Sequence, residues 1–300
     1  MVATRRPDPA PAALPAGEGT PSPVERVVRR LRRARFRSKV LRRPLVEVRR
    51  LGLGPDDVLI ASYPRSGTNW LMFLVAEAIT GEPSQFGAVH RRIPYIGGQR
   101  RAPRLLPDGG RIVYTHETHP IGRRRAVYLV RDPRDVVLSE YRWQQMTGVF
   151  DGDLDTFVDA FVTGRGNPWG AWDRHVRTWL ARADEPGSRV EVVRYEALHA
   201  SPVHELDRVL RSLGVVRPRP VLEGAVAANT VEAMRAKERG NPEAFAAHRK
   251  RDLPFVGAGA VSGWRGRLGD RNRALVEERF GPTMTLLGYE VGPGAQPTTR

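Results

Sequence analysis

The chain has 300 residues, of which 40% are hydrophobic, and its formal net charge at pH 7 is +16. A chain of this length and apolar content can bury a substantial core, which favours one α/β domain with an appendage. The chain contains no cysteine, which excludes disulfides, thiolate catalysis and cysteine-ligated zinc. Its seven histidines form no HExxH pattern, so we expect no metal site.

We expect no membrane-spanning segment and no export signal in the amino-terminal region. No apolar run is long enough to span a bilayer, and Arg5-Arg6 is followed by Pro/Ala-rich sequence instead of an apolar segment. We therefore expect a cytoplasmic protein.

Most of the excess positive charge lies at the amino-terminal end, where residues 1–50 carry a net charge of +10. Residues 1–23 are rich in Pro, Ala and Gly and are expected to be disordered. Residues 24–51 predict a basic helical arm that Pro44 breaks or ends. Either its apolar stripe packs on the main domain, or the arm contacts a membrane surface. A nucleic-acid contact is disfavoured because the arm has few aromatic residues for stacking.

Residues 57–81 predict a strand, a tight loop and a helix. Val58 to Ala61 is a short apolar run of the kind found in buried parallel strands, and apolar residues continue from Trp70 to Ile79 with helix-forming neighbours. The loop between them combines a proline, a glycine, hydroxyl side chains and Arg65 in front of the N–H groups that begin the helix. The helix dipole and these free N–H groups attract a phosphate-like anion. The spacing differs from the GxxxxGK[ST] loop of nucleoside triphosphatases.

The stretch YPRSGTNW in this loop resembles the 5′-phosphosulfate loop of the sulfotransferases, usually written YPKSGTTW. The resemblance implies that the donor is 3′-phosphoadenosine-5′-phosphosulfate (PAPS). It also implies donor contacts from Arg65, Ser66, Gly67, Thr68, Asn69 and Trp70. Trp70 is expected to stack on the adenine, because an indole covers a purine face at little entropic cost.

Residues 82–110 contain several Pro and Gly residues and predict a long irregular connection. Residues 111–114 then predict a strand that delivers Thr115-His116 at its carboxyl end, where open α/β sheets place ligands. Sulfotransferases carry Lys-Ser/Thr-His here, so the resemblance makes His116 the general base. An imidazole titrates near neutral pH and suits this role, and His119 is the competing candidate.

Residues 126–130 predict the next strand, and Asp132 and Pro133 begin a helix as its N-cap and first residue. The stretch YLVRDPRDVVLSEYRW resembles the family's 3′-phosphate segment, which implies that Arg131 and Ser139 hold the 3′-phosphate of the donor. Their separation of eight residues is a little over two helical turns, so both side chains can lie on one side of the helix.

Further helices are expected over residues 153–163, 169–183 and 202–213, the last capped by Ser201-Pro202, and a strand is expected over 189–194. His175, in a stretch that resembles the family's GSWxxHV, is expected to be structural. The resemblance further implies that Tyr195 and Thr230 approach the adenine.

Two departures from the family pattern affect the donor site. Arg65 replaces the usual lysine, and an arginine stabilises charge but does not act as an acid. Gly257-Ala258 replaces the usual Arg-Lys pair, which leaves Arg249, Lys250, Arg251 or Arg265 to compensate. We include Arg265 among the predicted donor contacts.

These observations predict an α/β, three-layer P-loop-like fold with a central parallel sheet flanked by helices. The sulfotransferase domain is expected over residues 52–290, followed by a flexible tail over 291–300. His116 would take a proton from a hydroxyl or amine of a small-molecule or glycan acceptor, and Arg65 would stabilise the leaving phosphate without a metal. Residues 91–104, 143–150 and 165–172 are expected to form the acceptor walls. The alternatives are a P-loop-type kinase and a non-catalytic protein that binds anions or nucleic acid.

Overall fold

The structure, a computed structural model, describes residues 47–119, 122, 124–246 and 249–292. The tail expected over residues 1–23 and most of the basic arm expected over 24–51 lie outside the described residues, as does the end of the expected tail from residue 293 onward. Those predictions therefore stay untested.

The centre of the described part is a parallel sheet of four strands in the order β2-β1-β3-β4. The strands are β1 (Val58–Ser62), β2 (Ile112–Thr115), β3 (Ala126–Val130) and β4 (Val190–Arg194). The chain moves outward from β1 to β2 and then crosses back to β3. The order therefore reverses between β1 and β3, which is where open α/β sheets bind ligands beyond the carboxyl ends of their strands.

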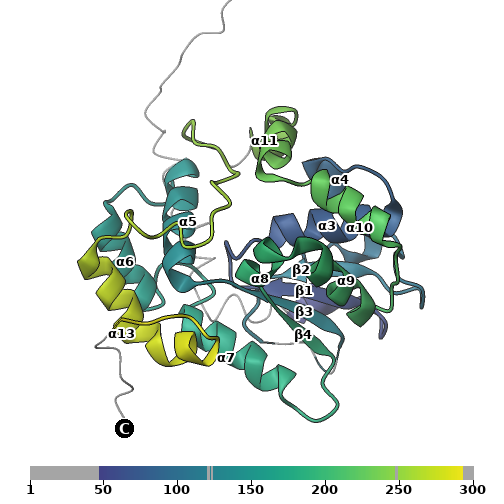
Figure 1. Cartoon of the computed structure of the whole chain (residues 1–300), viewed down its shortest axis with the longest axis horizontal. Helices are drawn as coiled ribbons and strands as arrows, with labels where there is room; N and C mark the ends of the chain where they lie inside the picture. Colours follow the sequence, from purple (N-terminus) through teal and green to yellow (C-terminus); the bar gives the residue numbers. More distant parts are fainter. Residues whose placement is uncertain (1–46, 120–121, 123, 247–248, 293–300) are drawn as a thin grey trace, which may run out of the picture. The chain divides into compact units, whose positions relative to one another are not determined.

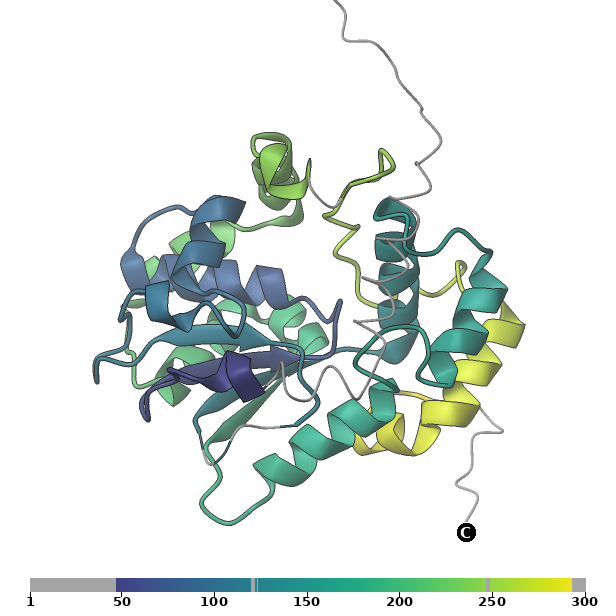
Figure 2. The same ribbon diagram turned by 180° about the vertical axis from the view of Figure 1, so that it is seen from behind.

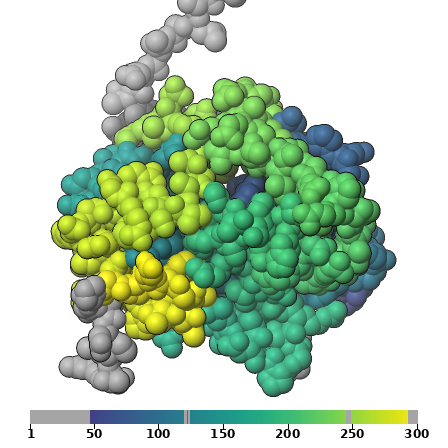
Figure 3. Space-filling view, viewed as in Figure 1, coloured from purple at the N-terminus to yellow at the C-terminus, as the bar shows by residue number. Residues whose placement is uncertain are grey.

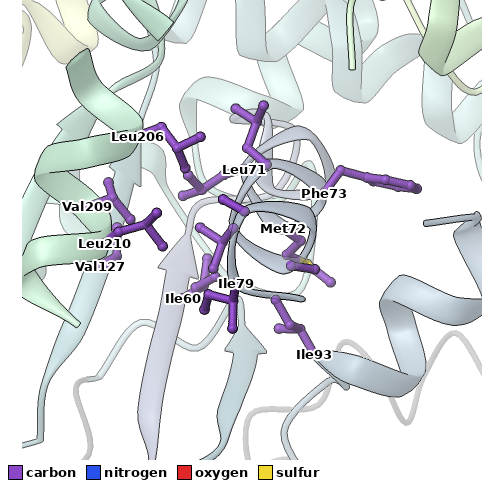
Figure 4. Packing of buried hydrophobic residues seen from close by; sticks show 14 of the residues in the cluster. Ile60, Leu71, Met72, Phe73, Ile79, Ile93, Val127, Leu206, Val209 and Leu210 are labelled. Carbon is purple, nitrogen blue, oxygen red and sulfur yellow. The ribbon is translucent and has the colours of Figure 1, made fainter. Parts of the chain in front are cut away.

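Alternate residues of β1 enter two different hydrophobic cores. Val58 and Ile60 belong to one core, and Leu59 and Ala61 belong to the other. This follows from the period of two along a strand, and it explains why the strand is apolar at every position. Figure 4 shows the first core, in which Ile60 and residues of α3 and α9 point toward one another.

Helices cover both faces of the sheet, as Figures 1 and 2 show. Helices α3, α4, α9 and α10 supply the first core, and α5, α6, α7 and α13 supply the second. The predicted three-layer α/β architecture is confirmed. The described helices are α3 (Thr68–Thr80), α4 (Phe86–Arg92), α5 (Pro133–Met146), α6 (Leu154–Val162), α7 (Trp172–Ala183), α8 (Tyr195–Ala200), α9 (Pro202–Ser212), α10 (Arg219–Ala227), α11 (Val231–Arg239), α12 (Glu243–Ala246) and α13 (Asp270–Leu286), with a 3-10 turn η1 (Gln99–Arg101).

Three local predictions need correction. The connection over 82–110 contains α4 and η1, because Phe86 and Val89 bury their side chains against the first core. Ser201 precedes α9, but its side chain makes no capping hydrogen bond. The helix expected from residue 169 begins at Trp172.

Other helix ends agree with the sequence. Asp132 accepts a hydrogen bond from the Arg134 N–H at the start of α5, and Pro133 is the first helical residue, as predicted. No helix in the described ranges is both long and apolar enough to cross a membrane.

Candidate active site

The loop between β1 and α3 is held in an unusual backbone conformation. Arg65 and Gly67 both have positive φ angles, of 69° and 101°. A Cβ atom at Gly67 would lie 2.6 Å from the ring of Tyr195. Glycine is therefore needed here both for its conformation and for the close approach of Tyr195.

Several buried oxygen atoms of this loop are suited to meet an anion. Ser66 is fully buried, and within the described part of the chain its hydroxyl has no hydrogen-bond partner. The Ser62 and Thr68 hydroxyls lie 2.5 Å apart, which ties the end of β1 to the start of α3. A buried hydroxyl without a partner costs free energy, and a phosphate oxygen beside it would remove that cost. The loop thus fits the phosphate group that its sequence predicts.

Arg65 extends from the loop toward α5. Its Nε–H donates to the Ser139 hydroxyl at 3.2 Å. Its guanidinium lies 5.2 Å from the ring centre of Trp143 and 4.9 Å from that of Phe255. Burial lowers the pKa of Arg65 to about 10, so the side chain stays cationic at neutral pH.

A buried carboxylate follows Ser139 on the same helix. Glu140 is only 3% exposed, and its Oε1 accepts a hydrogen bond from Gln144 at 2.9 Å. Burial raises the pKa of Glu140, while the positive charge of Arg65 opposes this shift. Glu140 and Arg65 thus lie close enough for each charge to affect the pKa of the other.

His116 lies beside this loop because of the register of the sheet. Ala61 pairs with Thr115, so the next residues, Ser62 and His116, are also neighbours. The His116 Nδ1–H donates to the Ser62 carbonyl at 2.9 Å. With the proton on Nδ1, Nε2 is the nitrogen that accepts a proton.

Aromatic rings surround the His116 imidazole. The ring centres of Tyr95, Tyr114 and Trp169 lie 6.3, 5.8 and 5.6 Å from it. Tyr95 and Trp169 come from two of the three segments predicted to form the acceptor walls, and Trp143 from the third lies against Arg65. The imidazole therefore lies among three aromatic rings.

His175 supports the backbone of His116. Its Nε2–H donates to the His116 carbonyl at 3.2 Å, and the Tyr128 hydroxyl donates to its Nδ1 at 2.9 Å. Because both ring nitrogens are engaged and the residue is fully buried, His175 is structural, as predicted.

His119, the competing base candidate, lines a different region. It borders a cavity of about 900 Å³ beside α7, together with Asp173, Arg174, Arg177 and Arg182. Neither Arg65 nor Ser62 borders this cavity.

Arg131 joins the β1–α3 loop at the carboxyl end of β3. Its guanidinium lies 4.2 Å from the ring centre of Tyr195, and its Nη1–H donates to the Arg65 carbonyl at 3.5 Å. Arg131, Ser139 and Tyr195 are thus brought together with Arg65 around the point where the strand order reverses.

The other predicted donor contacts are placed as follows. The Trp70 indole N–H donates to the Asn229 carbonyl at 2.9 Å, and its ring meets Tyr195 edge-on. The Thr230 hydroxyl caps α11 by accepting from the Ala233 N–H at 3.2 Å.

Arg265 differs from the other predicted contacts. Its side chain is 61% exposed, and it lies against the Trp264 ring and Glu290. Among the described residues it forms no hydrogen bond with Arg65, Arg131 or Ser139, and its predicted contact with the donor stays a prediction.

Glu140, Tyr114 and Phe255 are site neighbours that the sequence analysis did not single out. In the sequence alone, a glutamate two residues before Arg142 in an amphipathic helix resembles an ordinary surface charge, because nothing there shows that it is buried.

Figure 3 shows a hollow in this view, bounded by green and yellow-green atoms, with purple atoms of the early chain at its floor.

Comparison with known proteins agrees with this geometry. A family model described as the sulfotransferase domain matches residues 55–288. The chain belongs to the sulfotransferase family.

Relatives within this family are distant in sequence. Sulfotransferase 1 family member D1 of Mus musculus is 25% identical over 234 residues, which span 70% of this chain and 77% of the relative. Sulfotransferase 1A1 of Rattus norvegicus is 24% identical over 254 residues, which span 77% and 85% of the two chains.

Solved sulfotransferase-like structures share the fold. Retinol dehydratase, in complex with androsterone and the inactive cofactor PAP, has a TM-score of 0.65 at 18% identity and covers 83% of this chain and 86% of its own. Mouse sulfotransferase SULT7A1, complexed with PAP, has a TM-score of 0.61 at 18% identity, with coverage of 79% and 87%. The predicted family and fold are confirmed, and so is sulfuryl transfer as the class of activity.

Proposed function

We propose that this sulfotransferase moves a sulfuryl group from PAPS to a hydroxyl or amine of a small apolar acceptor, with His116 as the general base. The observation that carries the proposal is the hydrogen bond from the His116 Nδ1–H to the Ser62 carbonyl at 2.9 Å. It holds the imidazole beside the loop that suits the donor's phosphate.

Three features of the chain support PAPS as the donor. The Ser66 hydroxyl is buried without a partner in the described ranges, Arg65 is cationic beside it in sequence, and Arg131 lies at the end of the neighbouring strand. Retinol dehydratase and SULT7A1, which share the fold, were solved as complexes with PAP, adenosine 3′,5′-bisphosphate. PAP is what remains of PAPS after its sulfuryl group has left.

Different residues of the chain then have different roles in the reaction. His116 accepts the proton of the acceptor through Nε2 as the acceptor oxygen or nitrogen attacks sulfur, and the bond from sulfur to the phosphate oxygen breaks. Arg65 and the N–H groups at the start of α3 stabilise the negative charge that develops on the leaving phosphate. Because these groups are already in place, little reorganisation is needed during the reaction.

The residues around His116 favour an apolar acceptor. Tyr95, Tyr114 and Trp169 surround His116 with ring faces and edges. Retinol dehydratase was solved with retinol and with androsterone, which are both apolar alcohols. Of the two acceptor classes predicted from the sequence, these observations favour a small aromatic or isoprenoid alcohol over a glycan.

Binding of the donor nucleotide can be tested by ligand-induced thermal stabilisation of the full chain. We expect PAP to raise Tm more than ATP with Mg²⁺ or a short oligonucleotide at the same concentration, because a ligand stabilises a protein according to its affinity for the folded state. A larger shift with ATP and Mg²⁺, or a shift with the oligonucleotide alone, would contradict the proposed donor site. Among the described residues, no group of three or more His, Asp or Glu side chains is arranged to hold a metal ion.

The cytoplasmic location and the membrane contact of the basic arm stay predictions. The arm lies mostly outside the described residues, so a vesicle-binding assay on the full chain with and without residues 1–46 is the direct test.

A further inference from the structure

Residues 166–170, which we call the Trp169 segment, lie between α6 and α7 and form no helix or strand. The segment carries the Trp169 ring, whose centre lies 5.6 Å from that of the His116 imidazole. Because an irregular segment lacks the regular hydrogen bonds of a helix or sheet, its conformation depends on hydrogen bonds to other parts of the chain. Those hydrogen bonds therefore decide where the Trp169 ring lies.

Side chains from three other parts of the chain donate hydrogen bonds to main-chain carbonyl groups of the segment. These bonds run from Tyr63 to Gly170 at 2.9 Å, from Thr118 to Trp169 at 3.1 Å and from Gln144 to Gly166 at 2.6 Å. Tyr63 lies two residues before Arg65, and Thr118 lies two residues after His116. The segment is thus tied to the two parts of the chain that carry the proposed cation and the proposed base.

Asn167 connects Trp169 to Tyr63 from within the segment. Its Oδ1 accepts a hydrogen bond from the Trp169 N–H at 2.9 Å, and its Nδ2–H donates to the Tyr63 hydroxyl at 2.8 Å. Both side chains are buried, since Asn167 is 8% exposed and Tyr63 is 1% exposed. A buried amide that loses its partners costs free energy, so these two hydrogen bonds favour one arrangement of the segment.

The Tyr63 hydroxyl accepts from Asn167 and donates to the Gly170 carbonyl, so both ends of residues 167–170 bond to the same phenol oxygen. Gly170 has a φ of 84°, in the region that favours glycine, which allows the chain to turn there. Burial raises the pKa of Tyr63 well above its ordinary value, and the negative charge of Glu140 adds to this shift. The hydroxyl therefore keeps its proton and stays a donor near neutral pH.

We propose that Asn167 is a positioning residue of the acceptor site, which holds the Trp169 ring beside His116 through the Tyr63 hydroxyl. The inference rests on the proposed function, because it assigns Trp169 to the wall that an apolar acceptor contacts. An acceptor packed against the indole presents its hydroxyl to the His116 Nε2, and a displaced indole moves that hydroxyl away. Removal of the Asn167 side chain should therefore affect the acceptor and leave the binding of the donor nucleotide unchanged.

The test is steady-state sulfuryl transfer from PAPS by the full chain. The acceptors are 2-naphthol, androsterone and retinol, and the one that the wild type uses best serves for the variants. Asn167→Ala should lower kcat/KM for that acceptor by about tenfold, the effect of a lost buried hydrogen bond, with KM for PAPS within about twofold of the wild type. Calorimetric titration with PAP measures donor affinity independently of turnover.

Asn272→Ala is the matched control. Asn272 is a buried asparagine of α13, 3% exposed, whose Nδ2–H donates to Asp155 Oδ1 at 2.7 Å. Its removal should lower Tm as Asn167→Ala does but leave kcat/KM for the acceptor unchanged. The comparison separates the loss of a buried hydrogen bond in general from the loss of this one.

Two further variants test the path of the effect. In a chain that already carries Trp169→Ala, Asn167→Ala should lower kcat/KM by less than about twofold more, because the ring through which it acts is gone. Tyr63→Phe removes only the hydroxyl and should lower kcat/KM for the acceptor as Asn167→Ala does. If Asn167→Ala does not fold, as its Tm shows, Tyr63→Phe decides the same question.

The inference is refuted, while the proposed function stands, if Asn167→Ala and Tyr63→Phe use the acceptor as the wild type does. It is also refuted if either variant raises KM for PAPS as much as KM for the acceptor, or if Asn167→Ala has its full effect without Trp169. If the wild type binds PAP but sulfates none of the three acceptors, the proposed apolar acceptor fails, and this inference fails with it.

Discussion

The imidazole of His116 is anchored to the main chain of Ser62, through a hydrogen bond of 2.9 Å from Nδ1–H to the carbonyl oxygen. Ser62 ends β1 and His116 follows β2, and the two strands are adjacent and parallel with Ala61 opposite Thr115. A register shift of one residue would turn His116 to the opposite face of the sheet. Strand pairing, and not a local motif, thus places the proposed base beside the β1–α3 loop.

The charge of Arg65 can be tested apart from its shape. Arg65→Ala should lower the rate of sulfuryl transfer by about 100-fold and weaken PAP binding, because it removes a preorganised cation from the leaving phosphate. Arg65→Lys should retain much of the rate, since the cation persists. The measurement is kcat together with PAP affinity, and the control is Arg219→Gln, at an exposed arginine of α10 that pairs with Glu223. Normal kinetics for Arg65→Ala would remove the loop from the mechanism.

The conformation of Gly67 predicts a large effect from a single methyl group. Gly67→Ala places a Cβ atom 2.6 Å from the Tyr195 ring at a φ of 101°. We expect at least about a tenfold loss of PAP affinity and a fall in unfolding free energy of about 2 kcal/mol or more, from left-handed strain and overpacking together.

Gly81→Ala is the matched control for this substitution. Gly81 also has a positive φ, of 73°, but a Cβ atom there would meet nothing within 4 Å. It should cost about 1 kcal/mol through backbone strain alone and leave PAP binding unchanged. Equal effects of the two substitutions would show that contact with Tyr195 does not matter.

Asp135 makes stability depend on pH. Burial raises the pKa of Asp135 to about 6, and the neighbouring Arg131 opposes this shift. Because the pKa in the folded state exceeds the unfolded value of 3.8, folding favours the protonated carboxyl group. The stabilisation is present below about pH 4 and is lost as pH rises through about 6.

Asp135→Asn should therefore be more stable than the wild type at pH 7.5, by about 2 kcal/mol, with the difference shrinking toward pH 4. Urea denaturation at several pH values measures this. A difference between variant and wild type that stays constant across the range would contradict the assignment.

The sequence predicts much of the fold, the β1–α3 loop and the position of His116, for physical reasons. The buried run Val58–Ala61 and the loop after it combine strand, turn and helix signals within one continuous stretch, so they can be read locally. The position of His116 could also be predicted from the sequence, because a histidine directly after a strand lies at the carboxyl edge of a parallel sheet.

Other parts depend on contacts between distant segments. Helix α4 lies in a stretch interrupted by prolines, and it is stabilised by the burial of Phe86 and Val89 in the first core, which the sequence does not reveal. Tyr63 and Asn167 are 104 residues apart, and nothing in the sequence indicates that their side chains form a hydrogen bond. Tertiary structure is what brings them together.

The most direct test of the central claim is single-turnover transfer from bound PAPS to an apolar alcohol, measured for the wild type and His116→Ala. The His116 general base predicts a loss of about 100-fold or more in the transfer rate, with PAP affinity within twofold of the wild type. A His116→Ala variant that transfers the sulfuryl group at the wild-type rate would contradict it.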